Sequence, residues 1–430
     1  MHKKVLVLIL AFLVSLNLFS FKIYAQEEDV MIRIGLYFAS TAKDTVNIGS
    51  SAGMNIIGAD GAVYTINEAK TLPVSKAVGG FLVGDVGIIL GDKLEIKPLD
   101  GAYIEIENAK YRGYVELLRQ DGSDMTVINV VNLEEYLYSV VGKEMSPSFN
   151  IEALKAQAVC ARNYALTNMD KYKKYNFNLC NTQNSQVYLG VSAEHPNTIK
   201  AVEETRGVVA VYDGKLANLF FFASSGGRTE NSENVWTTPL PYLKGVDDPY
   251  ENPDEATRAN WTVEISKEDV KKKLADRGID IGDILDIVIT KRTENDRVYS
   301  LKFIGTNGEK EVFKENARNI LGLYSQKFII KKNDAVFYDI SGKAVPGNSY
   351  ALTAGGKAQV LSILYVLGKD GIKEYKSEPS DKFTFVGKGW GHGVGMSQWG
   401  AKGMADNGFT YDQILKHYFT GVEIVNAYNR

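Results

Sequence analysis

The sequence is poor in the residues that define several common classes of protein. It has only two cysteines, Cys160 and Cys180, among 430 residues, which excludes a disulfide-rich scaffold. A single disulfide between them stays open, as does a buried free thiol at Cys160, because nothing in the sequence fixes their geometry. The four histidines are scattered, and none is spaced from a cysteine as in a zinc site.

Excess positive charge and long apolar runs are also scarce. The net charge is −3 with no basic excess, which argues against a nucleic-acid-binding protein. Beyond the N-terminus there is no second long apolar run, so the sequence offers no further candidate membrane span. It has no internal repeat and no low-complexity tract. The composition is that of an ordinary globular protein, and the length allows roughly two or three domains.

Residues 1–25 are typical of a secretory signal peptide. A short basic region precedes an almost wholly apolar run from Val5 to Phe21, and Ala25 offers a cleavage site. The alternative is an uncleaved membrane anchor, for which the apolar run is short and is interrupted by Ser15 and Asn17. In either case we expect the rest of the chain to work outside the cytoplasm, secreted or held at the outer face of the cell membrane.

Residues 30–110 have the pattern of a β-rich N-terminal region. Alternating apolar residues predict a strand over Ile32 to Phe38, and further short strands follow between glycine-rich turns. Asp121–Gly122 is a turn dipeptide that pairs Tyr114 to Leu118 with Met125 to Val131 as a hairpin. The strands lead directly into a helical segment.

Two helices with a short corner between them follow these strands. Asn132 is a good N-cap, Glu135 can close a capping box with it, and Gly142 fits a left-handed position that ends the first helix. Asn150 can cap the second helix. Glu144 is then expected in the corner, where a preorganised carboxylate suits acid–base chemistry. The local pattern alone favours a solvated loop carboxylate.

Two later strings are rich in groups that bind ligands. The string ASSGGRTENSENVW, residues 223–236, predicts a loop whose backbone N–H groups and hydroxyls can bind sugar hydroxyls or an anion, although a plain surface loop fits equally. In GKGWGHGVGMSQWGAKGMA, residues 387–405, alternating glycines strip one face of an extended segment and let a backbone or ligand approach closely. The string fits no nucleotide-binding pattern. His392 stands between two of these glycines, and structural and site roles are both open to it.

The fold class that these patterns predict is α+β, with a β-rich N-terminal region leading into a mixed α/β catalytic core and an inserted small α/β module. The inserted module spans Val263 to Lys331, and hairpin-like strands follow from Asp334 to Asp381. The expected domains are the leader 1–25, the β-rich region 30–110, the core 111–262 with 386–430, and the insert 263–385.

Four blocks of the sequence together resemble the stage II sporulation protein D family, also called SpoIID/LytB. In chain order they are VVNLEEYLYSVVGKEMSPSFNIEALKAQAVCARNYAL, then SQVYLGV with FFFASSGGRTENSENVW, then ARNILGLYSQKF, then GKGWGHGVGMSQWGAKGMADNGFTYDQILKHYFTGV. One block would be modest support, whereas four in the family's order are specific. The resemblance spans roughly Tyr111 to Val422, leaving out about Asp334 to Phe385.

The resemblance implies peptidoglycan chemistry. Members of the sporulation type cleave glycan strands as lytic transglycosylases during forespore engulfment, act on strands that a partner amidase has stripped of stem peptides, and stimulate that amidase. The family's catalytic glutamate matches Glu144, which favours the acid–base interpretation over the solvated one. Such an enzyme needs no second carboxylate, because the sugar's own 6-hydroxyl attacks. A position of Glu230 or Glu233 within about 10 Å of Glu144 would indicate hydrolysis instead.

Around Glu144 we predict a cleft whose walls are the polar loop and the glycine-rich segment. The predicted substrate-binding residues are Gln186, Tyr188, Ser224, Ser225, Thr229, His392 and Gln398. Some family members carry metal ligands just before Gln-Val-Tyr, where this chain has Asn184 and Ser185, so we predict no metal and no cofactor.

The predicted partners are peptidoglycan glycan strands and a cell-wall amidase. We predict no nucleic-acid partner, and membrane contact only through an uncleaved N-terminal segment. The competing function is a non-catalytic cell-wall module that binds glycan and stimulates an N-acetylmuramoyl-L-alanine amidase, as the name "amidase enhancer" used for some relatives implies.

Overall fold

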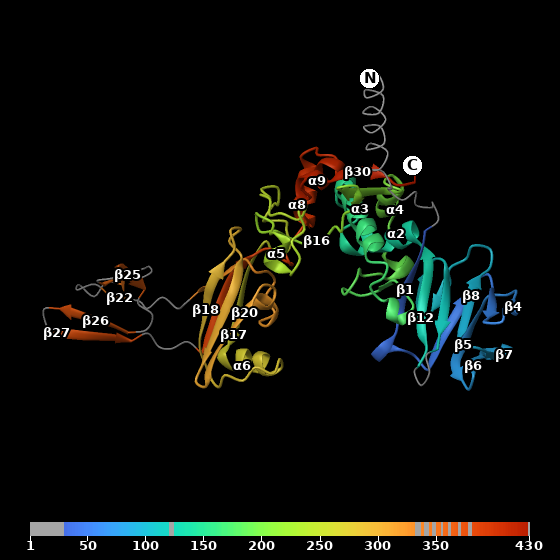
Figure 1. Ribbon diagram of the computed structural model, residues 1–430, viewed down its shortest axis with the longest axis horizontal. Helices are drawn as coiled ribbons and strands as arrows, with labels where there is room; N and C mark the ends of the chain where they lie inside the picture. Colours follow the sequence, from blue (N-terminus) through green and yellow to red (C-terminus); the bar gives the residue numbers. More distant parts are fainter. Residues whose placement is uncertain are drawn as a thin grey trace, which may run out of the picture. The chain divides into compact units, whose positions relative to one another are not determined.

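The computed structural model of this chain describes residues 30–119, 124–331 and 381–428, and the strands β22 to β27 between 337 and 376 (Figure 1). The predicted leader, residues 1–25, and the predicted turn at Asp121–Gly122 lie outside them. No helix within the described residues is long and apolar enough to cross a membrane. The chain divides into two compact units, which we call unit 1 (Met1–Phe221 with Gly400–Arg430) and unit 2 (Phe222–Trp399). Helices and several sheets are both present, so the predicted α+β class is confirmed.

Unit 1 begins with two largely antiparallel sheets, which confirm the predicted β-rich region. The first sheet has the order β13-β1-β12-β11-β8-β3-β4, and the second has the order β10-β9-β2-β5-β6-β7. In β1, Ile32, Ile34 and Leu36 are buried, as the alternating pattern predicts. The strands and short 3-10 helices here are β1 (Met31–Tyr37), η1 (Ala39–Thr41), β2 (Thr45–Ser50), β3 (Met54–Gly58), β4 (Val63–Ile66), β5 (Lys70–Ala77), β6 (Gly80–Val83), η2 (Gly84–Val86), β7 (Gly87–Leu90), β8 (Lys93–Pro98), β9 (Ile104–Ile106), β10 (Ala109–Tyr111), β11 (Tyr114–Leu118), β12 (Thr126–Asn132), η3 (Lys173–Tyr175), β13 (Leu179–Cys180) and η4 (Gly190–Ala193).

A group of helices follows β12, and Figure 1 shows α2, α3 and α4 gathered at one end of β1 and β12. A small sheet of order β15-β14-β30 packs with them. The elements of this part are α2 (Leu133–Glu144), α3 (Ile151–Thr167), α4 (Pro196–Glu203), β14 (Val208–Tyr212), β15 (Lys215–Leu216), α9 (Tyr411–Tyr418) and β30 (Glu423–Asn426), with α8 (Gln398–Asp406) where the chain returns from unit 2.

Side-chain caps set the start of both central helices, as predicted. The side chain of Asn132 accepts a hydrogen bond from the N–H of Glu134 at 2.9 Å, and that of Asn150 accepts one from Glu152 at 3.0 Å. The carboxylate of Glu152 also accepts the N–H of Tyr411 at 2.7 Å, at the first residue of α9. One acidic residue therefore serves the first turns of two helices, where the helix dipoles favour negative charge.

Helix α2 continues through Gly142, so the predicted helix end at this residue is wrong. A Cβ on Gly142 would stand 2.0 Å from the carbonyl oxygen of Ala193 in η4. Glycine is needed here for the close approach of a neighbouring backbone, not for a left-handed turn. As a result Glu144 is the last residue of α2 rather than a loop residue.

A fully buried ion pair joins the two central helices. Arg162 of α3 donates two hydrogen bonds to the carboxylate of Glu134 in α2, and a third to the carbonyl of Val208 at 3.0 Å. The same carboxylate accepts the N–H of Gly207 at 3.2 Å and the hydroxyl of Tyr428 at 3.0 Å. One network therefore ties α2, α3, β14 and the C-terminal segment together.

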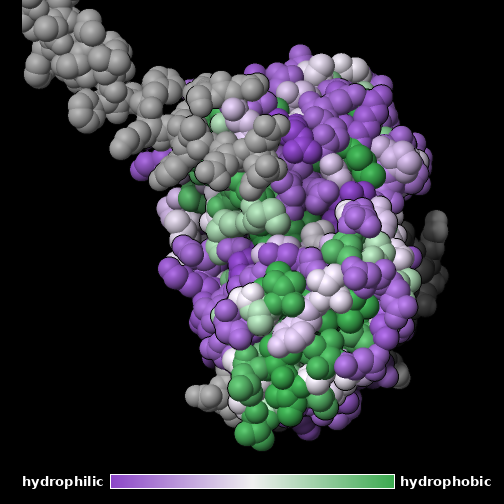
Figure 2. All heavy atoms as spheres, turned by 90° about the vertical axis from the view of Figure 1, so that its right-hand side faces the viewer, coloured by the Kyte–Doolittle hydropathy of each residue, from purple (hydrophilic) through white to green (hydrophobic). Residues whose placement is uncertain are grey.

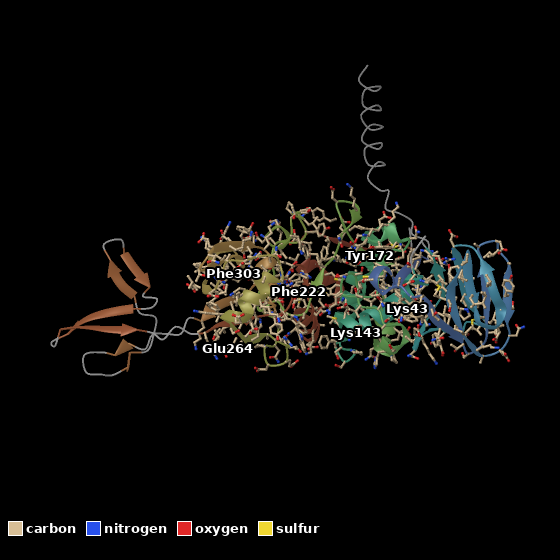
Figure 3. All side chains as sticks on the ribbon, turned by 90° about the horizontal axis from the view of Figure 1, so that it is seen from below. Lys43, Lys143, Tyr172, Phe222, Glu264 and Phe303 are labelled. Atoms are coloured by element: carbon tan, nitrogen blue, oxygen red, sulfur yellow. The ribbon has the colours of Figure 1, made fainter. Side chains whose placement is uncertain are left out.

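Unit 2 is built on two three-stranded antiparallel sheets, β17-β28-β21 and β18-β19-β20. Their shared core includes Leu301 and Phe303, the latter labelled in Figure 3. Ser266 caps α6 as predicted, with its hydroxyl accepting the N–H of Asp269 at 3.0 Å. The elements are β16 (Phe221–Phe222), α5 (Ser232–Val235), β17 (Asn260–Ser266), α6 (Lys267–Ala275), β18 (Ile284–Arg292), β19 (Val298–Gly305), β20 (Gly308–Phe313), α7 (Asn316–Asn319), β21 (Phe328–Lys331), β28 (Lys382–Lys388) and β29 (Met396–Ser397).

Unit 2 is wider than the insert expected at 263–385. Strand β17 pairs with β28 along its whole length, from Asn260 with Lys388 to Ser266 with Lys382. The expected boundaries cut through this pair of strands, which belongs to one sheet. The predicted hairpin-like strands after residue 334 are present as three antiparallel pairs: β22 (Phe337–Tyr338) with β23 (Ala344–Val345), β24 (Tyr350–Thr353) with β25 (Gly356–Gln359), and β26 (Ile363–Gly368) with β27 (Gly371–Lys376).

The glycine-rich segment does not form the extended strand that alternation suggested. Four alternate glycines, from Gly389 to Gly395, have positive φ values of 77°, 118°, 85° and 80°, a conformation open to glycine and costly for other residues. Other groups do approach closely. A Cβ on Gly391 would lie 2.7 Å from the Cβ of Phe222, and one on Gly393 would lie 2.6 Å from the guanidinium carbon of Arg297.

Replacing Arg162 with Met is expected to lower the free energy of unfolding by about 3–5 kcal/mol, because it leaves the Glu134 carboxylate buried without its counter-charge. Urea denaturation followed by circular dichroism measures the change. Arg206→Met is the control, because Arg206 pairs with Glu203 at 2.7 Å on the surface and should cost no more than about 1 kcal/mol. Equal losses for the two variants would contradict the role given to the buried pair.

Gly393→Ala is expected to destabilise unit 2 by more than the roughly 1–2 kcal/mol of left-handed strain alone, because the new methyl group would also strike the Arg297 guanidinium. Gly278→Ala separates the two effects, since Gly278 has φ of 71° with nothing within 4 Å of its added Cβ. Thermal melting compares them. A Gly393→Ala loss no greater than that of Gly278→Ala would show that the contact with Arg297 is unimportant.

Candidate functional site

Glu144 lies half buried at the C-terminal end of α2. The backbone turns extended at the next residue, Met145, whose side chain is buried. Lys143, labelled in Figure 3, is exposed and marks this end of the helix. Because Asn150 caps α3 six residues later, the carboxylate is held between two capped helices, as the sequence predicts, although it belongs to the first helix.

Tyr136 lies about two turns before Glu144 in α2, and it supports this helix from within unit 1. Its hydroxyl donates to the side-chain oxygen of Gln186 at 3.2 Å, and the Gln186 amide donates to the carbonyl of Ala161 at 3.4 Å. Burial above all, with smaller contributions from neighbours that include Glu144, raises the pKa of Tyr136 well above its ordinary value. Tyr136 therefore remains a neutral hydrogen-bond donor near the carboxylate.

Gln186 and Tyr188, which we predicted as floor residues of a cleft, are both only 2% exposed. The Tyr188 hydroxyl donates to the side-chain oxygen of Asn129 at 2.8 Å, and its ring lies 5.0 Å from that of Tyr136. Their polar groups are used inside unit 1 to hold α2 in place. Direct contact of either residue with a substrate stays a prediction.

In unit 2 the polar loop is gathered around Glu251, which the sequence analysis did not single out. Its carboxylate accepts hydrogen bonds from the Ser224 hydroxyl at 2.9 Å and from the N–H groups of Ser225 and Gly226. It also accepts the hydroxyl of Ser397 at 2.6 Å, just before α8. Glu251 stands in an ordinary acidic stretch, YENPDE, so no local pattern indicates its role.

The polar loop and the glycine-rich segment, predicted as walls of one cleft, lie side by side in unit 2. Ser224 and Trp390 exchange two backbone hydrogen bonds of 3.0 and 2.9 Å, and the N–H of Glu230 donates to the carbonyl of Gly393 at 2.8 Å. Thr229, between them in the loop, is fully buried. Of the predicted residues in unit 2, those of the loop are thus fixed against the glycines.

His392 uses one ring nitrogen within the glycine-rich segment. Its Nδ1 accepts the N–H of Val394 at 3.1 Å, which in the neutral ring assigns the proton to Nε2. The ring centre lies 5.4 Å from that of Phe222 and 5.1 Å from that of Trp236. Gln398, the other predicted residue here, is the mostly buried first residue of α8.

Arg297 is a second residue that sequence reasoning missed. It is fully buried and donates to the carbonyls of Ser225 at 2.8 Å and Arg228 at 3.0 Å, so it shapes the polar loop from beneath. Burial lowers its pKa to about 10, against the opposing effect of Glu230 and Glu251. Arg297 lies in the turn between β18 and β19, about seventy residues from its partners in the sequence. Because no local pattern joins it to the loop, its role could not be predicted from the sequence.

The two acidic residues of the loop, Glu230 and Glu233, both make bonds that hold the loop in shape. Glu233 pairs with Lys244 at 2.8 Å. Glu230 is fully buried, which leaves it no room to activate a water molecule. Its carboxylate accepts hydrogen bonds from the Asn231 N–H (2.8 Å), the Asn234 amide (2.9 Å), the Thr293 hydroxyl (2.5 Å) and the Asn295 amide (2.5 Å).

Within the described ranges no group of three or more histidine, cysteine, aspartate or glutamate side chains is placed to hold a metal ion. Cys160 and Cys180 are both free and buried, so of the two alternatives the free thiol is the one present. Glu144, Gln186 and Tyr188 belong to unit 1, and the predicted residues from Ser224 onward belong to unit 2. That the two sets line one cleft stays a prediction.

Comparison with known proteins places these features in a family. The family model described as "Stage II sporulation protein" matches residues 121–212, the part of unit 1 that holds Glu144, Gln186 and Tyr188. An uncharacterized protein of Brachyspira hyodysenteriae is 30% identical over 409 residues, covering 95% of this chain and 96% of that protein. The amidase enhancer of Bacillus subtilis is 29% identical, covering 91% of this chain and 54% of its own length.

The match that identifies the family is with a protein that carries the family's own name. The stage II sporulation protein D of Bacillus amyloliquefaciens is 30% identical over 313 residues, which cover 69% of this chain and 75% of that protein. The chain therefore belongs to the stage II sporulation protein D (SpoIID/LytB) family.

Proposed function

We propose that this chain cleaves the glycan strands of peptidoglycan by a lytic transglycosylase mechanism, with Glu144 as the single general acid and base. Its family membership and relatives support a role at the cell wall. The observation that carries the proposal is the position of Glu144. It is half buried, it ends a capped helix, and it lies in the segment that the family model matches.

In the proposed mechanism Glu144 first donates one proton and then accepts one. Its carboxyl protonates the glycosidic oxygen as the bond from that oxygen to the anomeric carbon breaks, through an oxocarbenium-like transition state. The sugar's own 6-hydroxyl then attacks the anomeric carbon, and the carboxylate takes the hydroxyl proton. The products are a strand with an anhydro end and a new free 4-hydroxyl, and the enzyme returns to its starting protonation state.

The elements around Glu144 hold it in place for this proton transfer. The Asn132 cap, the buried Glu134–Arg162 pair and the Asn150 cap fix α2 and α3 on either side. A side chain mounted in this way loses little conformational entropy on reaching the substrate.

Within unit 2 we propose that the polar loop and the glycine-rich segment supply sugar contacts. The Ser225 hydroxyl already bonds within the loop, and those of Ser224 and Thr229 bond to Glu251 and Val246, so all three hold the loop in shape rather than bind sugar directly. His392 is half buried, and its ring lies in the glycine-rich segment between Phe222 and Trp236.

A second function, stimulation of a cell-wall amidase, is favoured by two separate observations. The relative that matches 91% of this chain is named amidase enhancer. In unit 1, exposed apolar side chains gather over β5 to β7, among them Val78 (97% exposed), Leu82, Ile88 and Leu90, and Figure 2 shows this hydrophobic patch on the lower part of the face. Such patches mark surfaces where another protein docks. We propose an amidase as the partner, and action outside the cytoplasm, secreted or at the outer face of the membrane.

Glu144→Gln is expected to lower the rate at which anhydromuramyl ends form on peptide-free glycan strands by about a hundredfold or more, because the amide can neither donate nor take the proton. Mass spectrometry of the released fragments measures the ends. Glu135→Gln, in the first turn of the same helix, is the matched control and should keep nearly full activity.

Two results would count against the enzymatic proposal. One is an unchanged rate in Glu144→Gln. The other is the absence of anhydromuramyl ends with the parent chain, together with amidase stimulation that is intact in Glu144→Gln, which would leave the amidase-stimulating function in its place.

A further inference from the structure

Unit 2 carries a hollow on the outer face of the β17-β28-β21 sheet. Its volume is 450 Å³, within the range of about 300–1,000 Å³ that is usual for small-ligand sites. The side chains around it alternate along paired strands, so that Asn260 lies opposite Lys388 and Thr262 opposite Val386. Only Gly387 and Lys388 belong to the glycine-rich segment described above, and both lie at its start, in β28.

Gly387 is one of the residues that line this hollow. It lies between Trp261 on β17 and Phe328 on β21 in the same row of the sheet. An added Cβ on Gly387 would stand 2.2 Å from the Trp261 ring on the core side, so glycine here lets the indole pack directly against the sheet.

The charges around the hollow are not balanced. The Lys327 ammonium is half buried and makes no hydrogen bond or ion pair with any described residue. Burial, and then the nearby guanidinium of Arg297 and the ammonium of Lys388, lower the pKa of Lys327. The acid beside them, Asp296, already lies 3.4 Å from Arg292. An anion entering the hollow would meet Lys327, Lys388 and Arg292, whose positive charge the single carboxylate of Asp296 offsets only in part.

The same sheet edge continues into an aromatic platform. The Arg258 guanidinium lies 3.7 Å from the centre of the Tyr324 ring and 4.8 Å from that of Trp390. It too makes no hydrogen bond or ion pair with a described residue, and stacking of this kind leaves the in-plane N–H groups of a guanidinium free for a ligand. The Tyr324 ring lies 6.3 Å from that of Trp390 and 5.7 Å from that of Trp261, which lines the hollow, so the platform adjoins the hollow.

The platform is both exposed and rigid. Trp390 is 41% exposed, although its backbone is fixed by the two hydrogen bonds with Ser224. The N–H of Gly389 donates to the carbonyl of Ala259 at 3.0 Å, which carries the strand pairing beyond Lys388. Trp390 is therefore a fixed, partly exposed aromatic surface on which a sugar ring can stack.

We infer that the Arg258–Trp390 platform and the adjoining hollow form one binding site for a sugar that carries an anionic group. The apolar C–H face of the ring stacks on Trp390, and the anion binds between Arg258, Lys388 and Lys327. Asn260 and Thr262 offer neutral partners for hydroxyls. The source of such a sugar is a muramic acid, with its lactyl carboxylate, or a phosphorylated sugar of another wall polymer. The first source rests on the proposed function.

Binding by the full-length chain tests this inference without any turnover. The probes are the disaccharide of N-acetylglucosamine and N-acetylmuramic acid, chitobiose, which lacks the lactyl carboxylate, and N-acetylglucosamine 6-phosphate. Isothermal titration at low salt should show the acidic disaccharide binding about tenfold more tightly than chitobiose, with the preference falling as salt rises. Tighter binding of the phosphorylated sugar would support the anionic site and assign it to the second source.

Variants locate the preference. The double variant Lys327→Gln, Lys388→Gln should bind the acidic and neutral disaccharides within about twofold of each other. Trp390→Ala should weaken both sugars, and Lys310→Gln, on the exposed strand β20, should change neither. Circular dichroism establishes that each variant is folded.

Equal binding of the acidic and neutral probes by the parent chain, or a preference that survives in the double variant, would overturn the inference. A chain that keeps the preference but forms no anhydromuramyl ends would retain this site and lose only the proposed function.

Discussion

The buried ion pair between Glu134 and Arg162 is the interaction on which the geometry of unit 1 depends. Two charges removed from water are tolerated only where every remaining donor and acceptor is paired, and here Val208, Gly207 and Tyr428 complete the set. The requirement that all these groups meet sets the position of α2 against α3 and β14. Because Glu144 ends α2, the same requirement sets where the proposed catalytic carboxyl stands.

Features set by local chemistry were predictable from the sequence, and features set by distant contacts were not. The caps at Asn132 and Asn150 follow from side chains two residues from the N–H groups that they bind, and both predictions are confirmed. The prediction that Gly142 ends a helix was wrong because a glycine needed for a left-handed turn and a glycine needed for a close neighbour look alike in sequence. Only the position of Ala193, some fifty residues later, decides between them.

The candidate site divides in the same way. The motifs led to Glu144, to the polar loop and to the glycine-rich segment, and the structure places the last two side by side. Glu251 and Arg297, which both hydrogen-bond to the polar loop, carry no motif, and their loop partners lie some 25 to 70 residues away along the chain. Such residues preorganise a site without touching a ligand, which is why no pattern of ligand-binding residue types includes them.

The most direct test of the central claim follows the oxygen atom at the cut. In a lytic transglycosylase the atom that attacks the anomeric carbon is the sugar's own O6, whereas in a hydrolase it comes from water. Cleavage of peptide-free glycan strands in water enriched in ¹⁸O, read by mass spectrometry, distinguishes the two. The account predicts anhydromuramyl ends with no ¹⁸O in the new termini. Incorporation of ¹⁸O at new reducing ends would contradict a mechanism that relies on Glu144 alone.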